Sequence, residues 1–302
     1  MSQNTNTQIQ WLKRFASDKP VIFSMLVILA AGLLTEIPFG ALFEPWVGNP
    51  GAEFLRVVIG HTLTGLILVG LLVKLGLFRN ARFTPPSQWK ALWLTWPFAI
   101  FTLLNLDSLI AGDLVIDTTR PGLIILYTFM TLTIGFCEEV MGRGVVLSVL
   151  LQKWGHSRRG IYLAVLVSGA LFGAAHIFNL LANRLPLLAN LTQIGYSFAF
   201  GVLFAACFLR NNAIWPMIIM HAAVDFAGGL RDIAVGGAGQ FPVTNNTPME
   251  ALVTLCIVAL PTLLYGLWIL RKVAPPAERV LAVEAAADYP SSRNASKGTS
   301  IS

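Results

Sequence analysis

Charged side chains are scarce in this sequence. Only 12% of its 302 residues are Asp, Glu, Lys or Arg, and 55% are hydrophobic, whereas about a quarter of the residues in a soluble domain are charged. The scarcity extends along the whole chain, which excludes a soluble domain held by a single anchor. The composition therefore predicts a polytopic membrane protein.

Cysteines are also few. Cys137, Cys207 and Cys256 all fall within apolar stretches. They are expected to be buried as small hydrophobic side chains, and they do not form the paired pattern of a disulfide framework.

Long apolar runs recur along the chain, each close to the ~20 residues that a helix needs to cross a bilayer. They lie at residues 20–44, 53–78, 91–111, 121–151, 160–182, 187–210, 212–230 and 248–270. The sequence thus predicts an all-α, polytopic transmembrane helix bundle with about eight transmembrane helices. Residues 1–19 are expected to form a cytoplasmic N-terminal segment, 20–272 the transmembrane domain, and 273–302 a disordered cytoplasmic tail.

Basic residues are distributed unevenly between the two sides of this bundle. Sixteen of the 21 lysines and arginines fall on the side of the N-terminus, and Arg56, Arg120, Arg184 and Arg231 on the other, while Arg143 lies within a run. Because cytoplasmic loops are enriched in lysine and arginine, both termini are predicted to be cytoplasmic. This asymmetry explains the net charge of +6 without a nucleic-acid partner.

Three charged residues interrupt the fourth run, in the stretch GFCEEVMGRG: Glu138, Glu139 and Arg143. An ionised side chain at the centre of a membrane helix costs at least ~2.5–3.5 kcal/mol, so it needs partners inside the bundle. Glu139 and Arg143 are spaced i, i+4 and can form an ion pair. Glu138 points about 100° away from Glu139, which leaves it free to face another group.

Two further runs carry polar side chains. LFGAAHIFN places Phe172 and His176 one turn apart, and PMIIMHAAVDF places His221 and Asp225 one turn apart. Counted from the cytoplasmic ends at ~1.5 Å per residue, both histidines lie at a depth comparable with that of Glu138. Three helices can therefore place carboxylates and imidazoles in one buried pocket.

Three other polar side chains have simpler interpretations. Asn179 follows His176 by three residues and is expected to orient that ring or to line the pocket. His61 is alone in the second run, and His156 lies in a basic loop. Both histidines are expected to have structural or solvated roles.

Together these patterns resemble the CPBP intramembrane proteases, which comprise the type II CAAX prenyl endopeptidases and bacterial relatives associated with bacteriocin processing and immunity. EEVMGR resembles the EExxxR motif, FGAAH the FxxxH motif and HAAVD the HxxxN/D motif, in the family's order, within a core at 121–230. Gly142 departs from the pattern, because the family commonly has an aromatic residue before the arginine. Asp225 takes a place often held by asparagine.

The resemblance implies an intramembrane endopeptidase that hydrolyses membrane-associated or lipidated peptides, with a bacterial inner membrane as its default location. Glu138 would activate water with the help of His176, while His221 and a protonated Asp225 would stabilise the oxyanion. The residues expected to support this site are Glu139, Arg143, Phe172 and Asn179.

Two alternatives stay open. Glu138, His176 and His221 could instead bind zinc or another divalent metal. The sequence has no HExxH pair, so a mechanism without a cofactor is favoured. Buried acids and histidines also occur in proton-coupled transporters, and a non-enzymatic scaffold or immunity protein could use the same helices. The expected partners are the lipid bilayer and a peptide or protein substrate.

Overall fold

The computed structural model describes residues 2–182, 184–237 and 247–275. Within these ranges the chain is helical and contains no strand, and its β-structure is limited to an isolated bridge between Ile116 and Ala234. The predicted all-α class is confirmed. Most of the predicted disordered tail, from residue 276 onward, lies outside the described residues.

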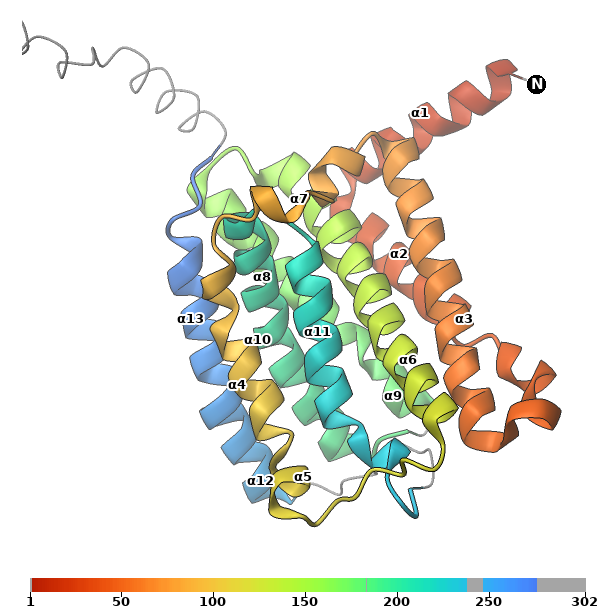
Figure 1. Cartoon of the computed structure of the whole chain (residues 1–302). Helices are drawn as coiled ribbons and strands as arrows, with labels where there is room; N and C mark the ends of the chain where they lie inside the picture. The colour runs from red at the N-terminus through yellow and green to blue at the C-terminus, as the bar shows by residue number, and fades with distance from the viewer. Residues whose placement is uncertain (1, 183, 238–246, 276–302) are drawn as a thin grey trace, which may run out of the picture.

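The bundle is built from helices of very different lengths (Figure 1). The α-helices are α1 (Ser2–Asp18), α2 (Pro20–Thr35), α3 (Glu44–Leu75), α4 (Trp96–Leu104), α5 (Asp107–Ala111), α6 (Pro121–Glu139), α7 (Leu147–Trp154), α8 (Arg158–Ala175), α9 (Ile177–Leu181), α10 (Leu187–Asn211), α11 (Trp215–Gly228), α12 (Pro248–Val253) and α13 (Leu260–Leu270). The π-helical segments η5 (Val140–Val146) and η7 (Thr254–Ala259) join α6 to α7 and α12 to α13. The short 3-10 segments are η1 (Phe39–Leu42), η2 (Phe78–Ala81), η3 (Pro86–Gln88), η4 (Leu92–Thr95) and η6 (Leu230–Ile233).

Six helical stretches of the described chain are long and apolar enough to cross a membrane. They are Pro20–Leu42, Glu44–Leu75, Pro121–Trp154, Arg158–Leu181, Leu187–Asn211 and Pro248–Leu270. The predicted span at 91–111 is divided among η4, α4 and α5. The predicted span at 212–230 contains α11, which has 14 residues, with Pro216 in its first turn and Gly229 at its end. Both residue types limit helices at these positions.

The outer surface and the chain ends fit a membrane bundle. Large side chains such as Leu66, Phe129 and Leu264 are exposed on the outer helices. Cys256, expected to be buried, is also exposed. α1 and the end of α13 lie at the same end of the bundle (Figure 1), and the assignment of that end to the cytoplasm stays a prediction.

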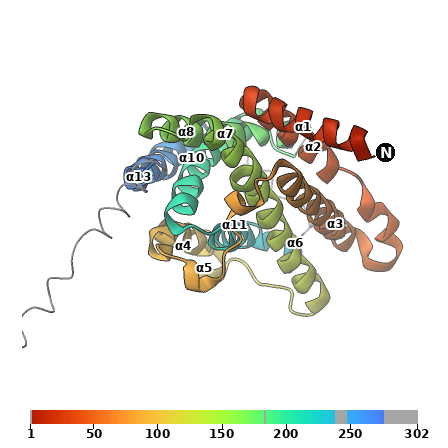
Figure 2. The same cartoon turned by 90° about the horizontal axis from the view of Figure 1, so that it is seen from above.

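α10 forms the centre of the bundle. It has the largest buried share among the six long stretches, 61%. It packs against α8 and α13 (Figure 2), while α6 packs against α3 and α11. The central helix therefore contacts α8, which ends at one predicted site residue, and it also contacts η5, which follows α6.

A glycine allows α6 to approach α11 closely. A Cβ added at Gly135 would lie 2.8 Å from the carbonyl oxygen of Ile218 and 3.2 Å from the amide nitrogen of Ala222. Real Cβ atoms are not found at such a distance from a carbonyl oxygen. This close approach brings the end of α6, with Glu138 and Glu139, against the helix that carries His221.

The turn after α11 is joined to the segment before α6. Asp117 donates a backbone hydrogen bond to Ile233 at 2.9 Å. Asp232 in this turn is 2% exposed, and its Oδ1 has no hydrogen-bond partner in the described structure. Burial raises the pKa of Asp232 from 3.8 to about 6, because the charged form loses its hydration.

Adding a methyl group at Gly135 should lower the thermal stability. Alanine improves helix propensity by up to ~1 kcal/mol, but at Gly135 the overpacking against Ile218 should cost about 1–3 kcal/mol. Gly122 in the same helix has no atom within 4 Å of an added Cβ. We expect Gly135→Ala to lower the melting temperature in detergent and Gly122→Ala to keep or raise it. Equal shifts in both variants would contradict this packing.

Asp232 should make stability depend on pH. Its pKa is higher in the folded protein than in the unfolded chain, so the folded state retains a proton that the unfolded state loses. Stability should therefore fall as the pH rises from about 4 to about 6 and then level off. We expect Asp232→Asn to have a higher melting temperature than the wild type at about pH 7, with a smaller difference at about pH 4. Asp113→Asn, which changes an exposed carboxylate, serves as the control. If both variants follow the wild-type pH profile, Asp232 has no such role.

Candidate active site

The predicted site residues lie on segments that meet inside the bundle. Glu138 and Glu139 end α6, Arg143 lies in η5, Phe172 lies in the last turn of α8, His176 caps that helix, and His221 and Asp225 lie in α11. Single π-helical turns inside longer helices are frequent at functional sites. Here the π-helical segment carries the arginine.

Glu139 and Arg143 form the ion pair that their spacing predicts. Arg143 Nη1 donates to Glu139 Oε1 at 2.8 Å, and the two side chains are 1% and 0% exposed. The second arm of the guanidinium, Nη2, donates to the carbonyl oxygen of Gly201 at 3.4 Å. Each buried charge thus has an oppositely charged partner that offsets the free energy of removing it from water.

His221 extends this ion pair into a three-residue network. Its Nδ1 lies 2.8 Å from Glu139 Oε1, the same oxygen that Arg143 contacts. Because a carboxylate oxygen accepts hydrogen bonds, Nδ1 carries the hydrogen, and Nε2 is left for other groups. The sequence predicted Arg143 as the partner of Glu139 and did not predict His221 as a second partner.

Two aromatic rings enclose the arginine. The guanidinium carbon of Arg143 lies 4.6 Å from the ring centroid of Phe172 and 4.8 Å from that of Phe204. Phe204 also stacks on the His221 ring at 5.4 Å, and Phe172 meets the edge of the His176 ring at 5.4 Å. The aromatic rings shield the charge of Arg143. Because each ring also contacts one histidine, Arg143 and its two rings lie between His176 and His221.

Glu138 is the accessible member of the glutamate pair. Its side chain is 25% exposed, and His221 Nε2 lies 3.7 Å from its Oε2. The same nitrogen lies 3.5 Å from Oδ2 of Asp225, whose side chain is 34% exposed. His221 therefore uses Nδ1 to contact the buried glutamate and presents Nε2 to two accessible carboxylates.

His176 is held by groups on both sides of its ring. Nδ1 lies 3.1 Å from the carbonyl oxygen of Phe172, and Nε2 lies 3.4 Å from Oγ of Ser197. The carbonyl group of His176 accepts a hydrogen bond from Asn190 at 2.8 Å. Asn179, which was expected to orient the ring or to line the pocket, donates to Gln193 at 2.9 Å, and its role at the pocket stays a prediction.

One face of α10 supplies partners that the three motifs do not include. These residues are Asn190, Gln193, Ser197, Gly201 and Phe204. Their spacings of three and four residues place them along a single helix face. Polar residues at helical spacing within an apolar run were the available signal, because such groups face a partner in the bundle interior.

Crowding does not explain why glycine occupies position 142. An added Cβ would contact only Phe172 Cδ2, at the ordinary distance of 3.7 Å. The departure from the family's aromatic residue therefore leaves space next to the ring that covers Arg143.

The alternative metal ligands are Glu138, His176 and His221. The described parts of the chain contain no group of three or more His, Cys, Asp or Glu side chains placed to hold a metal ion. A metal site formed by Glu138, His176 and His221 stays a prediction.

The fold and these side chains define a polytopic helical membrane protein with an acid–imidazole cluster inside its bundle. A family model described as Type II CAAX prenyl endopeptidase Rce1-like matches residues 120–227, which include all three motifs. This part of the chain is similar to that family, and the resemblance to CPBP intramembrane proteases is confirmed. No curated protein and no solved structure matches the chain. The domain is of the CAAX intramembrane protease kind, in a multi-pass membrane protein.

Removing the arginine should strongly destabilise the bundle. Arg143→Leu leaves Glu139 without its cationic partner, and breaking a buried pair in this way costs about 3–5 kcal/mol. We expect the melting temperature to fall, and to recover partly in the double variant Arg143→Leu with Glu139→Gln, which removes the orphaned charge and keeps an acceptor for His221.

Arg120→Leu is the control, because Arg120 belongs to an ion pair at the surface, with its side chain 43% exposed, and such pairs contribute little. Equal effects of Arg143→Leu and Arg120→Leu would contradict the structural role of the buried pair.

Proposed function

We propose that this protein is an intramembrane endopeptidase that hydrolyses peptide bonds of membrane-associated or lipidated substrates. The observation that carries the proposal is the contrast between the two adjacent glutamates. Glu139 is fully buried and engaged by Arg143 and His221, whereas Glu138 is partly exposed and lies 3.7 Å from His221 Nε2. A carboxylate that is accessible and not consumed by an ion pair is suited to be a general base.

Glu138 is the base that activates water in this mechanism. As the water oxygen attacks the carbonyl carbon of the scissile bond, Glu138 takes one of its protons. His176 assists by passing this proton on, because its Nδ1 donates to Phe172 and its Nε2, which lies 3.4 Å from Ser197 Oγ, is an acceptor. Glu138 then transfers its proton to the departing amide nitrogen as the carbon–nitrogen bond breaks, which restores the carboxylate.

His221 and Asp225 stabilise the negative charge that develops on the carbonyl oxygen. Glu139 accepts from His221 Nδ1 at 2.8 Å, so it can balance a second proton on Nε2. That N–H group and a protonated Asp225, acting as asparagine would, are the donors toward the oxyanion. Arg143, between its two aromatic rings, holds Glu139 in place for this purpose.

We further propose that the protein resides in a bacterial inner membrane with both ends cytoplasmic, an orientation supported by the asymmetry of its basic residues. A cysteine introduced at His156 should then be protected from a membrane-impermeant thiol reagent added outside the cell. Labelling from outside would contradict this orientation.

Glu138→Gln should abolish cleavage without unfolding the protein. Loss of a general base typically costs about 10²–10⁴ in rate, and glutamine preserves the size of the side chain. The measurement is cleavage of a fluorogenic peptide library by purified protein in detergent, with prenylated and unprenylated versions of each peptide and with and without a chelator.

Glu44→Gln is the matched control, since Glu44 is an exposed glutamate at the start of α3. Thermal unfolding verifies that both variants are folded. Wild-type cleavage by Glu138→Gln would refute the proposal, and equal signals from all proteins would favour a non-enzymatic scaffold or a transporter. Loss of activity with the chelator would favour the metal alternative.

A further inference from the structure

α3 lies directly against the part of α6 that leads to Glu138. A Cβ added at Gly65 would be 2.5 Å from Cε1 of Phe136 and 3.5 Å from Cα of Cys137, the residue before Glu138. α3 and α6 also make one of the most extensive helix–helix contacts in the bundle. The wall of the candidate site on this side is therefore formed by α3, which lies outside the matched family domain.

His61 lies on the face of α3 that meets α6. It precedes Gly65 by four residues, so both share one face of the helix. The ring is partly buried, and it lies one turn from the point where α3 meets Phe136 and Cys137. The expectation of a structural or solvated role for His61 did not consider that this part of α3 packs against the end of α6, because sequence alone does not show which helices are neighbours.

The tautomer of His61 follows from its one hydrogen bond. Nδ1 lies 3.0 Å from the carbonyl oxygen of Val57. Because a carbonyl oxygen can only accept, Nδ1 carries the hydrogen, and Nε2 of the neutral ring carries a lone pair. No partner for Nε2 is found among the described residues, so this nitrogen is an available acceptor.

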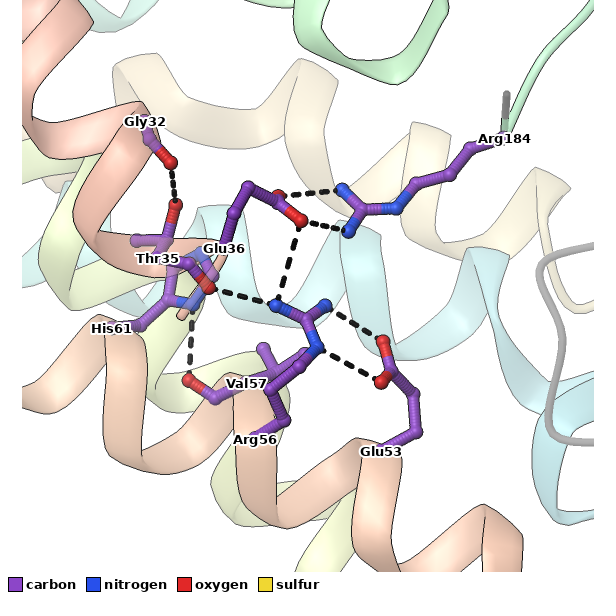
Figure 3. Close-up of polar contacts among 8 residues, drawn as sticks. All are labelled: Gly32, Thr35, Glu36, Glu53, Arg56, Val57, His61 and Arg184. Carbon is purple, nitrogen blue, oxygen red and sulfur yellow. Dashed lines mark hydrogen bonds and ion pairs between the residues drawn. The ribbon is translucent and has the colours of Figure 1, made fainter. Parts of the chain in front are cut away.

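A network of charged groups fixes the turn of α3 next to His61 (Figure 3). Arg56 donates to both carboxylate oxygens of Glu53, at 2.8 and 2.7 Å, and to the carbonyl oxygen of Thr35 at 2.7 Å. Its Nη1 also lies 3.7 Å from Glu36, which accepts two hydrogen bonds from Arg184 at 2.9 and 2.6 Å. Arg56 thereby ties the end of α2 to α3.

The same network reaches the segment that carries the second imidazole. Arg184 lies between α9 and α10, and α9 begins immediately after His176. Closer to the site, a Cβ added at Gly32 in α2 would clash with the ring of Phe178 in α9. The helices that carry His61 and His176 are therefore both attached to the end of α2.

We propose that His61 is a further catalytic residue, which orients the nucleophilic water together with Glu138. The Glu138 carboxylate and His61 Nε2 are both acceptors, so the molecule that can join them must offer two hydrogens, as water does. This inference rests on the function proposed above. Glu138 removes one hydrogen of the water as the new carbon–oxygen bond forms, while the other stays on oxygen and is donated to His61, which remains neutral throughout.

Substitutions at His61 test the role of its acceptor. His61→Leu removes the acceptor, and we expect kcat to fall by about 100-fold, the order of loss that follows misplacement of a reacting group, with KM little changed. His61→Gln can place an amide oxygen near the position of Nε2 and should recover much of the loss. His61→Asn is too short to do so and should remain impaired.

His156→Leu is the matched control, because His156 is an exposed histidine in the loop between α7 and α8. All variants are measured beside Glu138→Gln on the same peptides, with melting temperatures. An inactive Glu138→Gln with wild-type kcat in His61→Leu overturns the role of His61 alone, whereas an active Glu138→Gln overturns the proposed function. The acceptor role is also overturned if His61→Gln loses as much kcat as His61→Leu. It is overturned likewise if His61→Asn has a higher kcat than His61→Gln.

Discussion

The burial of Arg143 is the constraint on which the rest of the site depends. A guanidinium that is 1% exposed inside a membrane bundle survives only if its charge and its donors are satisfied. Glu139 supplies the counter-charge, the carbonyl oxygen of Gly201 accepts from the second arm, and the rings of Phe172 and Phe204 lie 4.6 and 4.8 Å from the guanidinium carbon. Each of these partners belongs to a different turn or helix, so satisfying the arginine also fixes how α6, α8 and α10 are arranged.

The two adjacent glutamates have different environments because successive residues of a helix point in different directions. Glu139 faces inward, where Arg143 and His221 share one of its oxygens. Glu138 faces the accessible side of the cluster, toward His221 Nε2. A single dipeptide can therefore supply both a buried, paired carboxylate and an accessible one. The helical geometry separates the two environments without a second motif.

Much of the site followed from spacing, whereas its supporting contacts depended on tertiary packing. The all-α class, the Glu139–Arg143 pair and the grouping of Glu138, His221 and Asp225 rest on helical periodicity and on the cost of charges in lipid. The Glu139–His221 contact and the partners from α10 could not be derived in this way, because periodicity shows which residues share a face and not which helix lies opposite. The same limit applies to His61. The π-helical segment at Val140–Val146 also has no clear signal in an apolar run.

The shortness of α11 has a consequence for hydration. Its 14 residues extend only about 21 Å at 1.5 Å per residue, against a hydrocarbon layer of about 30 Å. A helix this short matches the bilayer only if the lipid thins around it or if polar headgroups descend to meet its end. Asp225 lies in the last turn of α11, with its side chain 34% exposed. The mismatch therefore gives bulk solvent a short route to Asp225, as the hydrolysis proposed for this site would need.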